Sequence, residues 1–303
     1  MTVVVNPLIG VVGIAGNAVN CAVLRKSGFS KPSNIFLFGL AVADLLGLLP
    51  AVDVAFMLTK FPKHIPPGYS YWEYDCTDNR LALFYLNVSR ILISLAAFGQ
   101  NASCCLCVII TIERLIAVFF PLKFTAIVRP KRAWLVVVLL YVFWTVFAFM
   151  FARKITFFFT YTAKYKTCLS TFYLDFDDAE RLLDTVATWL SCYVSLGIVV
   201  ISSILIGAKI KMANRRRAKM TSSNSASSVT RTTQTLMAVC VVFSITQMVR
   251  FPYAMFRVSF QDEIAYETYQ MALTLTSNLN SASNFVIYVI LNNKFRRIFL
   301  GLF

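Results

Sequence analysis

Long apolar stretches alternate with short polar segments along the whole chain. A transmembrane helix needs about 20 predominantly apolar residues, and stretches of this length recur between the two ends. The pattern predicts an all-α membrane protein whose helices cover residues 3–24, 34–58, 89–120, 133–152, 182–208, 234–258 and 264–291.

The third and seventh stretches depart from a uniform apolar pattern. The third begins at Leu81, but Arg90 interrupts it and a helix of that length exceeds the bilayer, so we expect residues 81–88 to be an extracellular lead-in. The seventh is half polar, with hydroxyl and amide side chains between Thr274 and Asn284. Because lipid does not satisfy such groups, this helix faces other helices or a water-filled cavity.

Composition and charge agree with this topology. Of the 303 residues, 58% are hydrophobic and only 14% are charged, which excludes an ordinary water-soluble domain. The segments at or beyond the ends of the first, third, fifth and seventh predicted helices carry 18 of the 29 Lys and Arg residues. By the positive-inside rule these segments and the C-terminus are cytoplasmic, and the N-terminus is extracellular. The net charge of +15 is therefore a topology signal and does not indicate a nucleic-acid partner.

Short motifs lie at defined places on these helices. They are Gly16-Asn17, Leu40-Ala41-Val42-Ala43-Asp44, Glu113-Arg114-Leu115 with Pro121-Leu122, Phe251-Pro252-Tyr253, and the segment Asn280–Tyr288. In order and position they resemble the rhodopsin-like (class A) G-protein-coupled receptors across essentially the whole chain. The strongest likeness is to the FMRFamide-receptor-like or other peptide-receptor-like and chemosensory-receptor-like groups of invertebrates. The resemblance implies one seven-transmembrane helix bundle over residues 1–303, with a short amphipathic eighth helix at residues 292–302.

Asp44 is an acidic residue near the middle of an apolar predicted helix. A carboxylate at that depth costs at least about 2.5 kcal/mol unless other groups compensate it. If the helices pack as the resemblance implies, four polar side chains point at Asp44, namely Ser103, Asn280, Ser281 and Asn284. Their oxygens form a shell for an allosteric Na⁺ with waters. The alternative is a hydrogen-bonded network without an ion.

The resemblance also implies a switch at the cytoplasmic ends of the helices. Glu113 and Arg114 stand where the family has an acidic residue, an Arg and an aromatic residue. The two side chains are expected to pair in the resting receptor, and the freed guanidinium then meets a heterotrimeric G protein. The other residues implied in coupling are Pro121, Pro252, Asn284 and Tyr288.

Several positions depart from the family pattern. Leu115 replaces the aromatic residue, Phe285 replaces the proline that usually follows Asn284, and Arg250 replaces a tryptophan two residues before Pro252. The fifth predicted helix has no proline. We therefore expect a less kinked seventh helix, and a relay from ligand to sixth helix that differs from the common one.

Candidate ligand-binding residues face the expected outer cavity. They are Gln100, Asn101, Arg250, Tyr253, Arg257, Glu267, Gln270 and Thr274. The two arginines suit an acidic group on a ligand. The alternative is that they pair with acidic residues of the receptor itself.

Two ligand classes are disfavoured by single positions. Ala96 stands where an amine receptor has an aspartate, and residues 264–291 lack the lysine that a retinal-binding opsin needs for its Schiff base. The long segment 153–181 carries both charge signs and fits a peptide or small water-soluble ligand better than a lipid. The resemblance further implies an extracellular disulfide between Cys76 and Cys168, although Cys76 lies before the third helix and not at its top.

These features lead to one main hypothesis and three alternatives. We expect a multi-pass plasma-membrane receptor that binds an extracellular ligand, with a neuropeptide as the preferred class, and activates a heterotrimeric G protein. The alternatives are a chemosensory receptor for a soluble environmental chemical, a receptor-like protein that no longer couples, and a transporter or channel, which the lack of internal repeats disfavours. Enzyme activity has no support, because His64 is the sole histidine and no nucleophile–base pair or phosphate-binding loop is evident.

Overall fold

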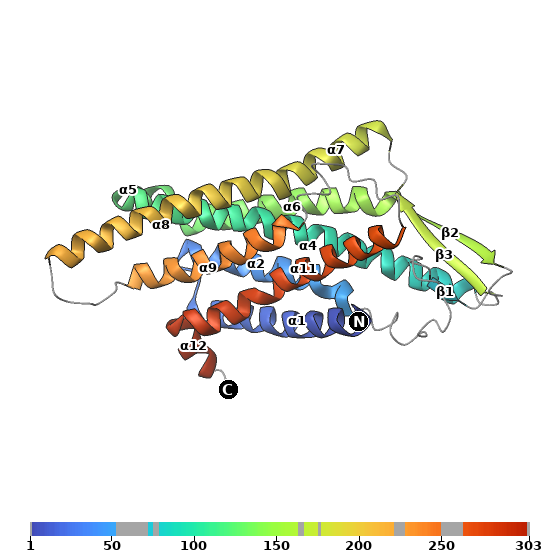
Figure 1. The fold of residues 1–303 in the computed structure, drawn as a ribbon, viewed down its shortest axis with the longest axis horizontal. Helices are drawn as coiled ribbons and strands as arrows, with labels where there is room; N and C mark the ends of the chain where they lie inside the picture. Colours follow the sequence, from blue (N-terminus) through green and yellow to red (C-terminus); the bar gives the residue numbers. More distant parts are fainter. Residues whose placement is uncertain are drawn as a thin grey trace.

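The computed structural model describes residues 2–52, 72–74, 79–162, 167–174, 177–220, 228–249 and 263–301. Long helices run side by side along the longest axis of the molecule, and a small β-sheet lies at one end of them (Figure 1). The N-terminus is at the sheet end, whereas the short helices α5 (Pro121–Ile127) and α12 (Asn293–Leu300) are at the opposite end. The bundle therefore has two chemically different ends.

Seven helical rods form the bundle within the described residues. They are α1 (Thr2–Ser27); α2 (Pro32–Leu48) with the 3₁₀ turn η1 (Leu49–Val52); α4 (Asn79–Phe119); α6 (Pro130–Lys154); α7 (Asp178–Thr188), η2 (Trp189–Val194) and α8 (Ser195–Met220) as one rod; α9 (Ser228–Met248); and α11 (Glu263–Leu291). Five described rods are long and apolar enough to cross a membrane. The other two are α9, whose described apolar part is shorter, and the polar α11.

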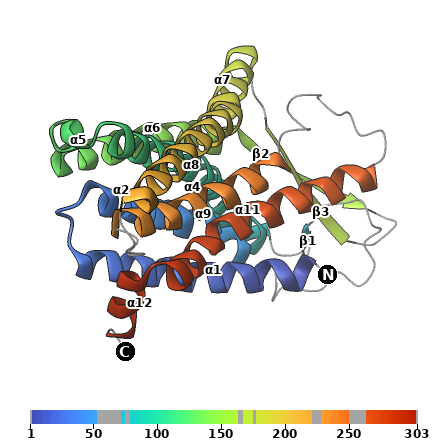
Figure 2. The same cartoon turned by 60° about the vertical axis from the view of Figure 1, so that its left-hand side comes forward.

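The predicted eighth helix is present as α12. Its charged side chains Lys294, Arg296 and Arg297 are exposed, whereas Phe295 is buried. Figure 2 shows α12 turning away from α11 beside the end of α1. Lys26 on α1 donates to the carbonyl of Gly301 at 2.9 Å, so the two helices are also linked by a hydrogen bond.

The third predicted helix is longer than expected. We expected it to begin at residue 89, but α4 begins at Asn79 and includes the segment assigned to a lead-in. Its 41 residues span about 62 Å, twice the thickness of a hydrocarbon core of about 30 Å. The extra turns extend toward the sheet (Figure 1). Arg90 does not break the helix, because arginine is a good helix former and is costly only within lipid.

The fifth rod contains a π-helical turn. The segment η2 (Trp189–Val194) interrupts the α-helical pattern in a chain segment that has no proline. Ser195 Oγ donates to the carbonyl oxygen of Leu190 at 3.0 Å within this turn. The periodicity of apolar residues did not predict this irregularity, because a π turn adds only one residue to a helical turn.

The long segment between α6 and α7 forms two strands, which the sequence pattern did not predict. It contains β2 (Ile155–Thr162) and β3 (Thr167–Leu174), which pair antiparallel with Phe158 opposite Thr171. A third strand, β1 (Trp72–Tyr74), pairs with β3 to give the order β1-β3-β2. The β-branched and aromatic residues of β2 favour a strand. The all-α description therefore applies to the helix bundle and not to this sheet.

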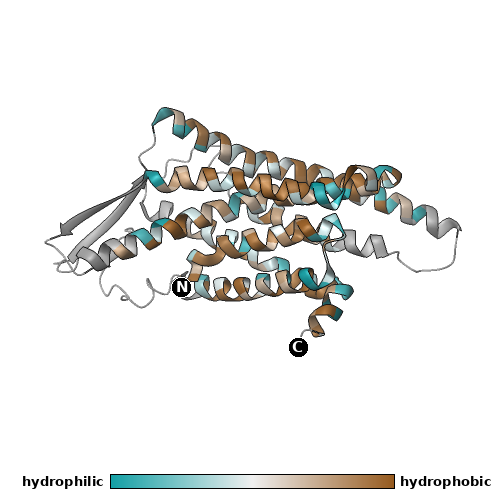
Figure 3. Cartoon of the chain, turned by 180° about the vertical axis from the view of Figure 1, so that it is seen from behind, coloured by the Kyte–Doolittle hydropathy of each residue, from teal (hydrophilic) through white to brown (hydrophobic). Residues whose placement is uncertain are grey.

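Apolar side chains lie both inside and outside the bundle. Leu40, Leu106 and Phe243 are almost completely buried in the core. Phe149 and Ile204 are each 65% exposed, and many neighbours on the outer faces are also apolar, as Figure 3 shows in brown. Helices that are apolar on both faces are typical of a protein surrounded by lipid.

The backbones of α2 and α4 approach closely at two glycines. A Cβ at Gly99 would lie 2.5 Å from the carbonyl oxygen of Ala43 and from the Cα of Gly47. A Cβ at Gly47 would instead meet Gly99 at 3.5 Å, an ordinary contact. This contact brings Asp44 of α2 toward the polar side chains of α4.

Candidate functional site

Asp44 lies at the centre of a buried polar cluster. Its side chain is completely buried, and three neighbours donate hydrogen bonds to it. Ser103 Oγ on α4 and Ser281 Oγ on α11 donate to Oδ1, each at 2.9 Å, and Asn284 Nδ2 on α11 donates to Oδ2 at 2.7 Å. The structure therefore brings together three of the four side chains expected around this carboxylate.

The fourth expected neighbour, Asn280, forms a hydrogen bond with α9. Its Oδ1 accepts a hydrogen bond from Thr246 Oγ1 on α9 at 3.2 Å. The polar cluster extends instead toward α1, where Asn17 Nδ2 donates to the carbonyl oxygen of Ser281 at 2.9 Å. Four helices (α1, α2, α4 and α11) are thus joined around Asp44.

The residues around Asp44 suit a monovalent cation chemically. A serine hydroxyl that donates to Asp44 keeps lone pairs with which it also accepts or coordinates. Ser103 and Ser281 therefore add neutral oxygens to the negative charge of Asp44, and oxygen ligands are those that hard cations prefer. The residue types of this donor set fit Na⁺.

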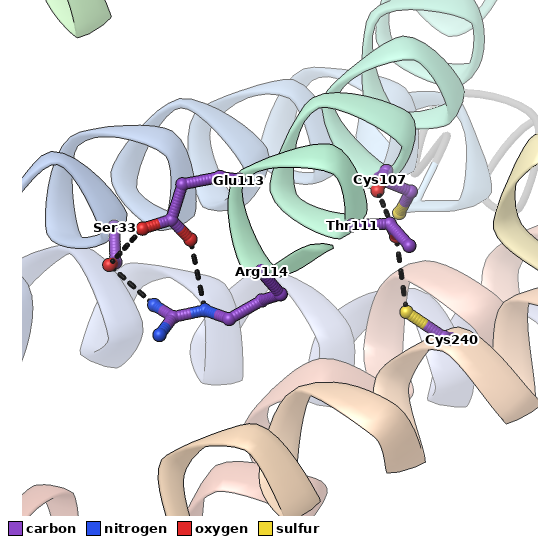
Figure 4. Close-up of polar contacts among 6 residues, drawn as sticks. All are labelled: Ser33, Cys107, Thr111, Glu113, Arg114 and Cys240. Atoms are coloured by element: carbon purple, nitrogen blue, oxygen red, sulfur yellow. Dashed lines mark hydrogen bonds and ion pairs between the residues drawn. The ribbon is translucent and has the colours of Figure 1, made fainter. Parts of the chain in front are cut away.

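A second cluster lies at the end of the bundle away from the sheet. Arg114 Nε and Glu113 Oε2 form an ion pair at 2.9 Å, and both side chains are largely buried. Ser33 Oγ, in the first turn of α2, donates to Glu113 Oε1 at 3.0 Å and also accepts from Arg114 Nη2 (Figure 4). This arrangement holds the guanidinium against α2. Sequence reasoning missed Ser33, because no local motif marks a serine whose partner lies 80 positions further along the chain.

One turn before Arg114, α4 also contacts α9. Thr111 Oγ1 donates to the carbonyl oxygen of Cys107 at 2.6 Å and lies 3.3 Å from Cys240 Sγ on α9 (Figure 4). Thr111 is 1% exposed and Cys240 is 5% exposed, so this contact is shielded from solvent. The described part of α9 is therefore packed against α4 beside the ion pair.

Tyr288 and Phe285 connect α11 to α12. Tyr288 is buried, and its ring centroid lies 5.6 Å from that of Phe295 on α12. Phe285, where the resembled family has proline, contacts the rings of Phe295 and Phe299 at 6.4 and 5.9 Å. Asn284 is thus in the Asp44 cluster, whereas Tyr288 lies in an aromatic cluster one turn further on. Among the remaining implied switch residues, Pro121 begins α5.

The predicted ligand-binding residues are only partly described. Gln100 and Asn101 are half-buried on α4, and Thr274 is exposed on α11. Asn101 Nδ2 donates to the carbonyl oxygen of Ala97 in its own helix at 2.9 Å. The side chains of Glu267 and Gln270 on α11 lie outside the description, as do Arg250, Pro252, Tyr253 and Arg257 entirely.

The predicted disulfide also falls outside the described residues. Cys76 is not described, and of Cys168 only the backbone is, in β3. That backbone lies opposite Tyr74 of β1.

Comparison with known proteins places these features in a family. The chain is 26% identical over 311 residues to an FMRFamide receptor of Drosophila melanogaster, a match that covers 98% of this chain and 52% of that protein. It is 30% identical over 142 residues to the Drosophila pyrokinin-1 receptor (46% of this chain and 29% of that protein). It is 28% identical over 151 residues to the mouse thyrotropin-releasing hormone receptor (50% and 34%).

The chain thus spans about half the length of the first of these relatives, and the matches to the others cover smaller parts of them. The model of the seven-transmembrane receptor (rhodopsin) family matches residues 16–288, which include both polar clusters and at least part of each of the seven rods. This match confirms the predicted seven-helix fold and the resemblance on which it was based, and it concerns a family of membrane receptors, which are not enzymes. The chain belongs to the rhodopsin family of seven-transmembrane receptors.

Proposed function

We propose that this protein is a plasma-membrane receptor that binds an extracellular peptide and activates a heterotrimeric G protein. The observation that carries the proposal is the closed cluster of Ser33, Glu113 and Arg114 at the end of the bundle away from the sheet. Arg114 there is a buried cation whose charge is compensated by the Glu113 carboxylate and which also donates a hydrogen bond to the Ser33 hydroxyl. This cluster is closed in the helix packing described above. A different packing that separates these side chains would expose the guanidinium of Arg114.

The chemistry of the switch follows from the partners of Arg114. While Glu113 and Ser33 bind Arg114, the N–H donors of its guanidinium point toward α2 and are shielded from solvent. Displacement of α9 from α4 opens space beside Arg114, whose planar fork then donates to acceptors on a G protein. The basic residues near this end, such as Lys123 and Arg132, favour an acidic partner and the anionic cytoplasmic leaflet.

The Asp44 cluster is proposed to bind Na⁺ in the resting state. Asp44, Ser103 and Ser281 would hold the ion, with waters as further ligands, and Asn284, which donates to Asp44 through Nδ2, would orient the carboxylate. The ion would supply positive charge to a carboxylate buried among α2, α4 and α11. If activation shifts these helices relative to one another, occupancy of the cluster would favour the resting packing.

The ligand side of the molecule is proposed to be the sheet end. The relatives described above include receptors for FMRFamide, pyrokinin and thyrotropin-releasing hormone, which supports a peptide in preference to an environmental chemical. Gln100 and Thr274 lie on α4 and α11, and both helices extend toward the sheet (Figure 1). Residues Arg250, Tyr253, Arg257, Glu267 and Gln270 are proposed to complete the site.

The orientation and the disulfide belong to the same proposal. The N-terminus lies at the same end of the bundle as the sheet. Basic residues are concentrated near α5 and α12, which lie at the opposite end (Figure 1). The positive-inside rule then makes the sheet extracellular. In that oxidising compartment Cys76, two residues after β1, is proposed to bond Cys168 on the neighbouring strand β3.

The test uses Arg114→Ala, with Arg129→Ala as the matched control because Arg129 is exposed in the same region. Cells expressing each variant with a promiscuous G protein receive a peptide library, and second-messenger release is normalised to surface receptor. We expect Arg114→Ala to lose the response and Arg129→Ala to keep it. A full response from Arg114→Ala at normal surface level would contradict the proposal.

A further inference from the structure

Gln247 on α9 joins three helices through one side chain. It is 7% exposed, and its Nε2 donates to Cys104 Sγ on α4 at 3.2 Å. Its Oε1 accepts from Cys192 Sγ in η2, also at 3.2 Å. We call Gln247, Cys104 and Cys192 the Gln247 bridge. Both ends of one amide are thus used to hold α9 against two neighbours.

The bridge depends on the π-helical turn. Buried positions along this rod recur every three or four residues, at Ala187, Ser191, Ser195, Val199, Ser202 and Ile206. Cys192 is an additional buried position, 5% exposed and directly after Ser191. A π turn contains an extra residue and therefore presents one more side chain to the same face. The irregularity at η2 thus places the Cys192 thiol at Gln247.

Two other polar contacts link α9 to its neighbours at different levels of the bundle. Thr246, next to Gln247, donates to Asn280 on α11 at 3.2 Å. Cys240, nearly two turns toward the start of α9, lies 3.3 Å from Thr111 on α4. An outward displacement of α9 separates it from α4, so the bond from Gln247 to Cys104 has to break.

We propose that Gln247 is a positioning residue that holds α9 against α4 and η2 in the resting receptor and so sets its basal activity. The inference rests on the proposed function, in which displacement of α9 exposes Arg114. Two interhelical hydrogen bonds of average strength in a membrane protein shift a two-state equilibrium about eightfold, or about 1.2 kcal/mol. Loss of the bridge is therefore expected to raise the displaced population by that factor.

Cys240 provides a readout that needs neither ligand nor G protein. Its thiol is buried between α9 and α4, so N-ethylmaleimide reaches it only when α9 is displaced. With full-length protein in lipid nanodiscs, the alkylation rate of Cys240, followed by peptide mass spectrometry, is proportional to the displaced population. We expect Gln247→Leu to raise this rate about eightfold.

Two controls separate displacement of α9 from general loosening of the bundle. Cys21 on α1 is alkylated in the same molecules, and its rate should not change. Ser244→Ala removes another polar group of α9, whose hydroxyl donates at 2.8 Å to the carbonyl oxygen of Cys240 in its own helix. This variant is expected to match the unmodified protein.

The thiol partners extend the test. Cys104→Ala and Cys192→Ala each remove one bond and should raise the Cys240 rate about threefold. Cys192→Ser retains a donor and should restore the original rate. An unchanged rate in Gln247→Leu overturns the inference, and so does an equal rise at Cys21. Because no G protein takes part, this outcome is distinct from failure of the proposed function, which the Arg114→Ala experiment tests.

Discussion

The contact between Gly99 and Gly47 offers a test of the helix packing that forms the Asp44 cluster. The perturbation is Gly99→Ala, which adds a single Cβ on α4 where α2 passes. That atom would lie 2.5 Å from Ala43 O and from Gly47 Cα, about 0.9 Å closer than an ordinary contact of 3.4 Å. Both obstructing groups are backbone, so neither rotates away. The two helices have to separate.

The expected cost follows from this geometry. Overpacking of a close-packed interface costs about 1–3 kcal/mol, and we expect the upper part of this range because the obstruction is rigid. For a protein of this size that corresponds to a decrease of about 5–10 °C in the midpoint of thermal unfolding. Asp44 is adjacent to this contact, so its hydrogen bonds to Ser103 and Ser281 should weaken together.

Two alanine variants control for the substitution itself. Gly47→Ala faces the same interface, but its Cβ meets Gly99 at an ordinary 3.5 Å. A Cβ at Gly197 in α8 meets nothing within 4 Å. Both should be neutral or slightly stabilising, because alanine is the better helix former by about 1 kcal/mol. Thermal midpoints of the full-length variants in detergent decide the matter. Equal midpoints for Gly99→Ala and Gly47→Ala would refute the packing described above.

Three further predictions concern the polar clusters. If Na⁺ binds at Asp44, NaCl should lower basal nucleotide exchange relative to KCl in the unmodified protein but not in Asp44→Asn, and a decrease that Asp44→Asn retains would rule out Na⁺ at this site. Ser33→Ala removes the hydroxyl that contacts both members of the ion pair, so basal exchange should rise about fivefold; an unchanged rate would mean that the serine does not hold the switch. Asn17→Ala loses the 2.9 Å bond to Ser281 O, and its free energy of unfolding should fall by about 1–2 kcal/mol, seen as a lower thermal midpoint than that of the unmodified protein. A midpoint equal to that of the unmodified protein would count against this estimate.

The helices and the Asp44 cluster were largely predictable from sequence. Bilayer thickness sets the length of an apolar stretch, so α1 and α6 lie close to their predicted positions. The predicted second helix begins near its expected start, but α2 ends at Leu48 and residues 53–58 lie outside the described part of the chain. Asp44 was identifiable because an isolated carboxylate in an apolar helix needs partners. Ser103 and Ser281 followed from the helix arrangement that the family resemblance implied, and both donate to it.

Other features depend on tertiary contacts that no local pattern reveals. Ser33 lies in the first turn of α2, where a serine is common and indicates no special role. Its role follows only from its hydrogen bond to Glu113 on another helix. No local motif marks the thiols of Cys104 and Cys192, yet Gln247 connects them. The strands β2 and β3 lie in a segment for which we predicted no strands, although its β-branched and aromatic residues favour pairing.

The central claim is that this receptor converts binding of an extracellular peptide into nucleotide exchange on a G protein. The direct measurement is GTPγS binding to purified heterotrimer in vesicles that contain the full-length protein, with and without a peptide identified in the library screen. The account predicts peptide-dependent exchange that is lost in Arg114→Ala and kept in Arg129→Ala. Specific binding of the peptide without any increase in exchange would contradict it.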